Sequence, residues 1–399
     1  MKPSVHVAGA GVISAIGNTW SENFFALENG MSGIAEMMVL DSVHASRLPV
    51  GEVKLTNDEL AYRTGASRYL TRTALLGIHA AKEAYLDCGI RNMDFWRVGL
   101  ISGTTVGGMD RSEKFFPSFI EDTNRGRLRD IVRHECGRTT EAIADALDIR
   151  GFVSTINTAC SSSVNAIIYG ARLIMQNKLD IVFAGGSDCL TRFTLNGFNS
   201  LMILDQQRCR PFDASRNGLN LGEGAGFVVL VSDRVVEEET LTPFAIVSGY
   251  ANTSDAFHQT ASSPEGRGSY HAMKNALDMA GLTPEEISYI NLHGTGTVNN
   301  DASEGAAIRR LFGDNPPAFS STKSFTGHAL GACGGIEAVY SLMAIKHQCV
   351  FPNLGFETPV PEVELIPETK FRNAEIAHVM SNSFGFGGNC SSVIFSGSR

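Results

Sequence analysis

Ile287-Ser288-Tyr289-Ile290-Asn291-Leu292-His293-Gly294-Thr295 is an apolar, β-branched stretch that ends in a Gly-Thr pair. The first half of the chain holds a second version of the same pattern, Val98-Gly99-Leu100-Ile101-Ser102-Gly103-Thr104. Short apolar runs bounded by glycine are typical of central strands that are covered on both faces. The repetition therefore predicts a chain built from two similar halves.

The repeat extends beyond these two strands. Phe244–Gly249 has the same strand-and-glycine pattern as the opening segment Val5–Ile13. Thr158–Ser163 opens a helix of small and apolar residues, and Thr326–His328 opens another one in the second half. Strands that alternate with helices build parallel or mixed sheets with helices on both faces, so we predict an α/β fold.

The boundary between the halves is expected in the acidic, proline-marked segment Asp233–Pro243, which we interpret as a solvated linker. This places the first half at residues 1–240 and the second half at residues 241–399. The other segments with clear periodicity are a helix and three buried strands, predicted at Thr73–Asp87, Val98–Ser102, Ile181–Ala184 and Phe227–Val231.

Composition limits the class of protein. The 399 residues carry a net charge of -9, which argues against bulk attraction to nucleic acid or to an anionic membrane. No apolar run approaches the roughly 18 residues of a membrane-spanning helix, and the N-terminus lacks a signal-peptide pattern. The eight cysteines include no Cys-x-x-Cys pair, so neither a disulfide framework nor a zinc cage is predicted. We expect a cytoplasmic protein with reduced cysteines.

Three reactive side chains stand at strand-to-helix corners with glycine nearby. Cys160 follows the β-type run Val153–Ile156 and precedes a helix, where the helix dipole favours a thiolate. His293 ends a strand, and His328 follows Gly327 at a predicted helix start. A single buried Cys or His is usually structural, but three such residues at equivalent corners indicate a catalytic site.

Other site classes fit the sequence less well. Gly9–Ser14 follows a strand, but it lacks the third glycine and the later acidic residue of a dinucleotide fingerprint. No Gly-x-Ser-x-Gly elbow is present for a serine hydrolase. A cysteine protease would need an orienting Asn rather than a second His with Lys323.

Four motifs together resemble the elongating β-ketoacyl-acyl carrier protein synthases, in the order that this family shows and over nearly the whole chain. They are Thr158–Ser163, His293–Thr297, Lys323–His328 and Ser383–Asn389, and Arg210–Asp213 and Gly222–Gly226 add to the resemblance. The family has the thiolase fold, two similar halves in a five-layered α-β-α-β-α arrangement, and is normally dimeric. The resemblance places the nucleophile in the first half and both histidines in the second.

The resemblance also implies the reaction. Cys160 would take an acyl group from an acyl carrier protein, and His293 and His328 would each donate an N–H to the enolate formed when a malonyl group loses carbon dioxide. This decarboxylative Claisen condensation would extend a fatty-acid or polyketide chain by two carbons. Thiolases use a second Cys, and initiating synthases use one His and one Asn, so two His indicate the elongating class. A non-catalytic chain-length partner would lack Cys160.

Further residues receive roles by the same resemblance. The backbone N–H groups of Cys160 and Phe386 would form the oxyanion hole, with Phe386 also acting as a glycine-flanked gate. Lys323 would be held by Glu304 and would tune His328. The residues expected to hold the phosphopantetheine arm or to support the site are Thr295, Thr297, Phe198 and Phe384. No metal and no cofactor other than the carrier's phosphopantetheine is expected.

Two departures from the family pattern bear on substrate and partner. Ser112 is small and polar where fatty-acid enzymes line the acyl pocket at the dimer interface with bulky apolar residues, which favours an aryl-polyene or type II polyketide pathway as the alternative. In that alternative a heterodimer with a chain-length factor replaces the homodimer. An acidic carrier protein would meet a basic cluster that we predict from Arg125, Arg127, Arg129 and Arg133, with Arg68 and Arg72. The alternative interpretation of this cluster is an ordinary solvated helix face.

Overall fold

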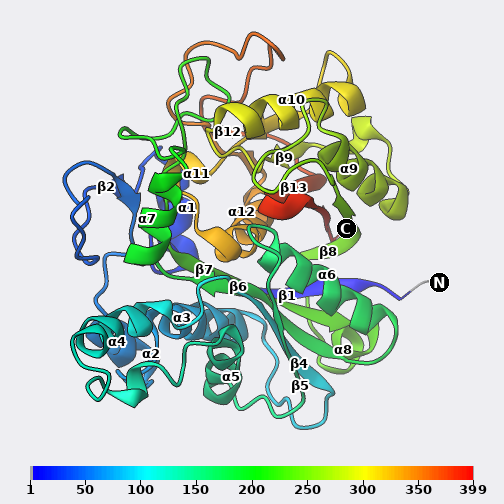
Figure 1. Cartoon of the computed structure of the whole chain (residues 1–399). Helices are drawn as coiled ribbons and strands as arrows, with labels where there is room; N and C mark the ends of the chain where they lie inside the picture. Colours follow the sequence, from blue (N-terminus) through cyan, green and yellow to red (C-terminus); the bar gives the residue numbers. More distant parts are fainter. Residues whose placement is uncertain (1–2, 399) are drawn as a thin grey trace.

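One mixed sheet runs through the computed structural model, which describes residues 3–398 (Figure 1). Within those residues the ten strands of the sheet follow the order β10-β9-β13-β14-β8-β1-β7-β6-β4-β5. In that order they are Ala318–Ser320, Tyr289–Asn291, His378–Gly385, Asn389–Gly397, Ala245–Ser254, Val5–Ile13, Gly224–Ser232, Ile181–Asp188, Val98–Gly103 and Phe152–Ile156.

The sheet consists of two halves with the same internal order. In the first half β4 lies parallel to β5 and β6, while β7 and β1 continue antiparallel. In the second half β9 lies parallel to β10 and β13, while β14 and β8 continue antiparallel. The halves join where β1 pairs with β8, His6 opposite Ile246. The two Gly-Thr strands, β4 and β9, thus occupy equivalent positions, which confirms the predicted repeat.

Helices complete five layers. Two central helices, α6 (Ser162–Met175) and α12 (Cys333–His347), lie between the halves of the sheet, and α12 packs against β7 on one side and β13 on the other. The outer face of the first half is covered by α3 (Arg72–Asp87) and α5 (Cys136–Ala146), and that of the second by α9 (Arg267–Ala280) and α10 (Val298–Phe312). The predicted α/β thiolase-type arrangement is confirmed.

A close glycine contact allows α12 to occupy the central layer. A Cβ on Gly226 of β7 would lie 2.4 Å from the backbone carbon of Gly335 on α12, so a side chain there would push the helix off the sheet. Residues 333–345 of α12 are buried on every side of the helix, as expected for a helix enclosed between the two halves of the sheet. This packing fixes the start of α12 close behind the predicted motif Lys323–His328.

The boundary segment differs from the prediction. Asp233–Glu238 forms a short helix, α8, rather than a solvated linker, because Ser232 caps it and Val235 is buried beneath it. The predicted division at residues 240/241 falls between α8 and β8. The smaller elements are α1 (Trp20–Glu28), β2 (Ile34–Ala35), β3 (Val50–Gly51), α2 (Asn57–Thr64), α4 (Met109–Glu121), α7 (Arg192–Ser200), α11 (Lys323–Thr326), β11 (Cys349–Val350) and β12 (Arg372–Asn373).

The four predicted periodic segments are all confirmed, as α3, β4, β6 and β7. Over residues 3–398, none of the helices combines the length and the apolar character that crossing a membrane requires.

Candidate active site

Cys160 lies between the end of β5 and the start of α6. The preceding residue, Ala159, adopts a left-handed backbone conformation (φ 53°), which an L side chain rarely adopts outside functional turns. The turn is held by Ser161, whose hydroxyl donates to the Asn389 side chain at 2.7 Å. Cys160 itself is buried. The predicted position of Cys160 at a helix N-terminus is therefore confirmed.

The two histidines come from the second half of the chain. His293 follows β9, and its backbone N–H donates to Glu304 at 2.9 Å. His328 follows Gly327, whose φ of 68° turns the chain, and its backbone N–H donates to the Asn220 carbonyl at 2.7 Å. The helix predicted to start at His328 starts later, at Cys333, because a short 3-10 turn over Leu330–Ala332 intervenes.

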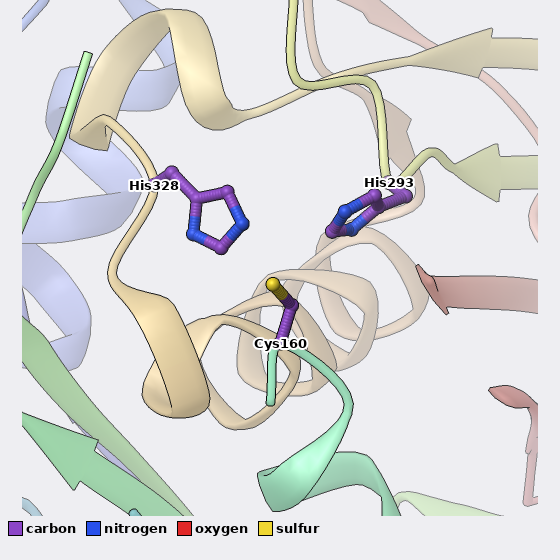
Figure 2. Close-up of side chains that lie close together, drawn as sticks. All are labelled: Cys160, His293 and His328. Atoms are coloured by element: carbon purple, nitrogen blue, oxygen red, sulfur yellow. The ribbon is translucent and has the colours of Figure 1, made fainter. Parts of the chain in front are cut away.

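The three side chains converge on one space (Figure 2). One ligand-type atom of each of Cys160, His293 and His328 lies within 4.8 Å of the others, and the two imidazole rings stand perpendicular with centroids 5.5 Å apart. All three residues are buried. The structure thus brings together the three residues that the sequence singled out from distant parts of the chain.

Hydrogen bonds behind the two rings fix their tautomers. The Lys323 ammonium lies 3.4 Å from Nδ1 of His293, and the Leu330 backbone N–H lies 3.0 Å from Nδ1 of His328. An ammonium and a backbone N–H can only donate, so both Nδ1 atoms are acceptors. The Sγ of Cys333 lies 3.2 Å from the same atom of His328. Each neutral ring therefore carries its proton on Nε2.

Burial controls the charges of the site. It lowers the pKa of His328 to about 3, with help from the positive Lys323, and it lowers the pKa of His293 well below the ordinary value. Both rings are therefore neutral at pH 7. Burial also raises the pKa of Cys160 to about 11, although the Phe386 N–H and Lys323 favour the thiolate. Burial therefore favours the thiol of Cys160 and opposes the thiolate that the helix position favours.

The predicted partner of Lys323 is wrong. The Lys323 ammonium forms a buried ion pair with Glu337 of α12 and lies 3.4 Å from Nδ1 of His293. Its charge also lowers the pKa of His328, in line with the predicted influence on that ring. Glu304 instead accepts the backbone N–H groups of His293 and Gly294. Burial raises the pKa of Glu304 to about 7. Glu337 was missed by sequence reasoning, although a single charged residue in the apolar helix 333–345 was a usable signal.

A cavity of about 330 Å³ leads to the three side chains. Residues from both halves of the chain line it, and the predicted ones among them are Cys160, His293, His328, Thr295, Thr297, Phe198, Phe384 and Phe386. The rings of Phe198 and Phe386 are stacked, with centroids 5.9 Å apart and 13° between their planes. Sequence reasoning missed several polar and apolar lining residues, including Met202, Asn217, His258 and Cys390.

Ser112 does not line this cavity. Its side chain is buried in α4, where its hydroxyl lies 2.8 Å from Nδ1 of His134 and 3.3 Å from the Gly108 carbonyl. The hydroxyl of Ser112 is thus hydrogen-bonded within its own chain, and its place beside an acyl pocket at a dimer interface stays a prediction.

The predicted basic cluster is only partly available to a partner. Arg72 is buried and forms an ion pair of 2.5 Å with Glu223, so it does not contribute to a docking surface. Arg68 and Arg129 lie over the ring of the exposed Tyr69, at 5.2 and 4.9 Å from its centroid. The remaining predicted arginines, Arg125, Arg127 and Arg133, flank a 3-10 turn over Leu128–Asp130 rather than a helix face.

A buried Cys and two neutral His between two similar α/β halves define a condensing enzyme of the thiolase type. The family models for the N-terminal and C-terminal domains of β-ketoacyl synthases match residues 2–235 and 244–357. The chain therefore belongs to the β-ketoacyl synthase family, and it is an enzyme of that class, as its motifs predict.

Relatives and solved structures agree with this assignment. "3-Oxoacyl-[acyl-carrier-protein] synthase 2" of Staphylococcus aureus (strain N315) is 33% identical, with 98% of this chain and 97% of the relative covered. The protein of the same name from Coxiella burnetii is 32% identical, with 99% of both covered. The ishigamide ketosynthase/chain length factor structure superposes over 100% of both chains with a TM-score of 0.94 at 29% identity. The ketosynthase ApeO, in complex with its chain length factor ApeC from Xenorhabdus doucetiae, gives a TM-score of 0.85 at 32% identity, covering 99% and 98%.

Proposed function

We propose that the protein extends an acyl chain held on an acyl carrier protein by two carbons, through decarboxylative Claisen condensation. The observation that carries the proposal is the convergence of the Cys160 thiol with two neutral imidazoles that each present an Nε2–H to the same space. The S. aureus relative is named for the acyl carrier protein on which its substrate is carried.

The first half-reaction transfers the acyl group. Cys160 sulfur attacks the carrier thioester, the carrier thiol leaves, and the proton of Cys160 ends on that thiol. Negative charge develops on the carbonyl oxygen, and the backbone N–H groups of Cys160 and Phe386 receive it. Donors of this kind are typically worth about 3 kcal/mol each in transition-state stabilisation. The Phe386 N–H already interacts with the Cys160 sulfur, which supports this placement.

The second half-reaction forms the carbon-carbon bond. The bond from the malonyl carbon to its carboxylate breaks, carbon dioxide leaves, and the electron pair forms an enolate whose oxygen accepts the Nε2–H of His293 and of His328. The enolate carbon then attacks the acyl carbonyl and the Cys160 thiolate leaves, to be protonated again from solvent. The electrons come from the breaking bond, so we propose that no metal or redox cofactor takes part.

The edge strand β5 offers a place where a second subunit can pair with the sheet. Strand β5 is an edge strand that pairs only with β4 among the described strands, and Phe152 and Val153 on it are each 37% exposed. Exposed apolar edges favour pairing with another chain. We propose a dimer through this edge, in the cytoplasm, where the eight unpaired cysteines stay reduced.

An aryl-polyene or type II polyketide pathway is the second candidate. Two structures with the same fold, at 29% and 32% identity, are of ketosynthases with chain length factors, which makes a heterodimer at the β5 edge as consistent as a homodimer. The mass of the acyl group trapped on Cys160 in cells distinguishes the pathways. A saturated group supports fatty-acid synthesis, and a polyunsaturated or polyketide group supports the second candidate.

The test of the reaction is Cys160→Ala, compared with Cys390→Ala, which removes another thiol that lines the same cavity. We expect Cys160→Ala to lose acyl transfer from the carrier protein and Cys390→Ala to keep it. Full acyl transfer by Cys160→Ala would refute the proposed nucleophile.

A further inference from the structure

The catalytic cluster has the donor set of a zinc site. Zinc binds cysteine thiolates and neutral imidazoles, and three protein ligands with one open position are typical of catalytic zinc. Here Cys160, His293 and His328 bring one such atom each within 4.8 Å of one another, and the cavity beside them leaves room for a fourth ligand. Among residues 3–398 this is the cluster whose composition and spacing suit a transition metal.

The groups behind the imidazoles donate hydrogen bonds to the rings, whereas the groups behind the histidines of a zinc site accept them. A zinc-bound His donates its other N–H to a carboxylate or carbonyl oxygen, which leaves the facing nitrogen free to bind metal. In this protein the groups behind the rings are donors, the Lys323 ammonium for His293 and the Leu330 N–H for His328. Each ring therefore keeps its proton on the nitrogen that a metal would need.

We propose that Lys323 and the Leu330 N–H keep this cluster free of transition metals. To bind a metal, each ring would have to move its proton from Nε2 to Nδ1, where that proton would face another donor. Lys323 adds a second obstacle, because its positive charge lies directly behind one ligand of an incoming dication. Glu337 holds the ammonium in this position through their buried ion pair. Lys323 thus acts on the metal indirectly: it holds the His293 ring in the tautomer whose Nε2 carries a proton and does not bind metal.

This inference goes beyond the proposed reaction, because it concerns a class of ligand that the site excludes, the transition metal ions. A metal bound to Cys160 would remove the nucleophile, so the donors behind the rings preserve a free thiol in a zinc-containing cell.

Cobalt(II) tests the proposal, because a thiolate-cobalt bond gives a charge-transfer absorption. The full-length protein is titrated with Co²⁺ and compared with the double variant Lys323→Met/Glu337→Gln, which removes the donor without leaving a buried carboxylate unpaired. We expect no charge-transfer band from the unchanged protein at micromolar Co²⁺. The double variant should show the band and bind Co²⁺ at least tenfold more tightly.

Three controls make the result specific. Lys274→Met removes an exposed lysine paired with Asp278 and should behave like the unchanged protein. Adding Cys160→Ser to the double variant should abolish the band, and thermal unfolding should show that each variant is folded. Nitrogen-15 NMR of the histidines provides a second readout, with both rings as Nε2–H tautomers in the unchanged protein.

Equal Co²⁺ affinity in the unchanged protein and the double variant would overturn the proposal, as would an Nδ1–H tautomer at His293 in the unchanged protein. These measurements need no turnover. Equal Co²⁺ affinity would overturn the inference and leave the proposed condensation reaction standing, whereas an Nδ1–H tautomer at His293 would also remove the Nε2–H that the condensation uses. The two failures are therefore distinguishable, and loss of the reaction would leave the Co²⁺ titration interpretable.

Discussion

The ammonium of Lys323 is paired with the carboxylate of Glu337 in the interior of the protein, with side chains 1% and 3% exposed. The pair connects α11 with the central helix α12 directly behind His293. Burial opposes the charge of Lys323, but the carboxylate outweighs it, and the pKa of Lys323 is raised. The pair therefore places a permanent donor behind the ring of His293.

Replacing either partner of this pair alone should lower the free energy of unfolding. Removing one partner of a buried ion pair leaves an uncompensated charge and typically costs 3–5 kcal/mol, so we expect Lys323→Met and Glu337→Gln each to lower the free energy of unfolding by about 4 kcal/mol. The free energy of unfolding of the double variant should fall by much less than the sum of the two single losses. Urea unfolding of the four proteins measures the coupling. A loss in the double variant equal to the sum of the two single losses would show that the two residues do not depend on each other.

The exposed pair of Lys274 and Asp278 is the matched control for that cycle. Exposed pairs on one helix contribute only about 0.3–0.5 kcal/mol. A comparable coupling at both pairs would contradict the role of burial.

The reactivity of Cys160 should depend on pH in a way that reports its environment. Burial raises the pKa of Cys160 to about 11, so the thiolate fraction should increase about tenfold per pH unit between about pH 6 and pH 9, without a plateau. Alkylation by iodoacetamide, followed at Cys160 by mass spectrometry, measures this slope. A plateau below about pH 8 would show a resting thiolate instead.

The sequence predicts the strands, the two halves and the three residues that converge in the candidate site, because each has a local signal. Val98–Thr104 and Ile287–Thr295 share a pattern that needs no tertiary information, and Cys160 lies in a motif of adjacent residues. Glu337 lies on the helix after the Lys323–His328 motif, so its pairing with Lys323 depends on how α12 packs between the sheets. No spacing rule could choose it over Glu304.

The same reasoning explains the other corrections. Arg72 belongs to a cluster of basic residues in the sequence, but the fold buries it against Glu223. The thiol of Cys160 occupies the helix start that favours a thiolate, yet burial in a closed site has the larger effect on its pKa. Charge and burial are properties of the assembled protein, and a one-dimensional pattern does not contain them.

The stacked rings of Phe198 and Phe386 should control access to Cys160. The aromatic contact is worth about 1 kcal/mol and holds Phe386 against the cavity wall, so Phe198→Ala should free the Gly385–Gly388 segment. We expect alkylation of Cys160 to become several-fold faster. Phe193→Ala removes an exposed ring from the same helix and should leave the rate unchanged. An unchanged rate in Phe198→Ala would show that the stack does not limit access.

Thr297 allows pantetheine binding to be separated from helix capping. Its hydroxyl accepts the Asn300 N–H at the start of α10, and it lies 2.9 Å from the Thr295 hydroxyl in the cavity. Thr297→Val should lower the free energy of unfolding by about 1 kcal/mol through loss of the cap and should raise the KM for carrier-bound malonyl groups severalfold. Thr297→Ser retains the hydroxyl and should preserve both the free energy of unfolding and the KM. Thr297→Val with lower stability but unchanged KM would show that the residue is a cap alone and that the pantetheine arm is held elsewhere.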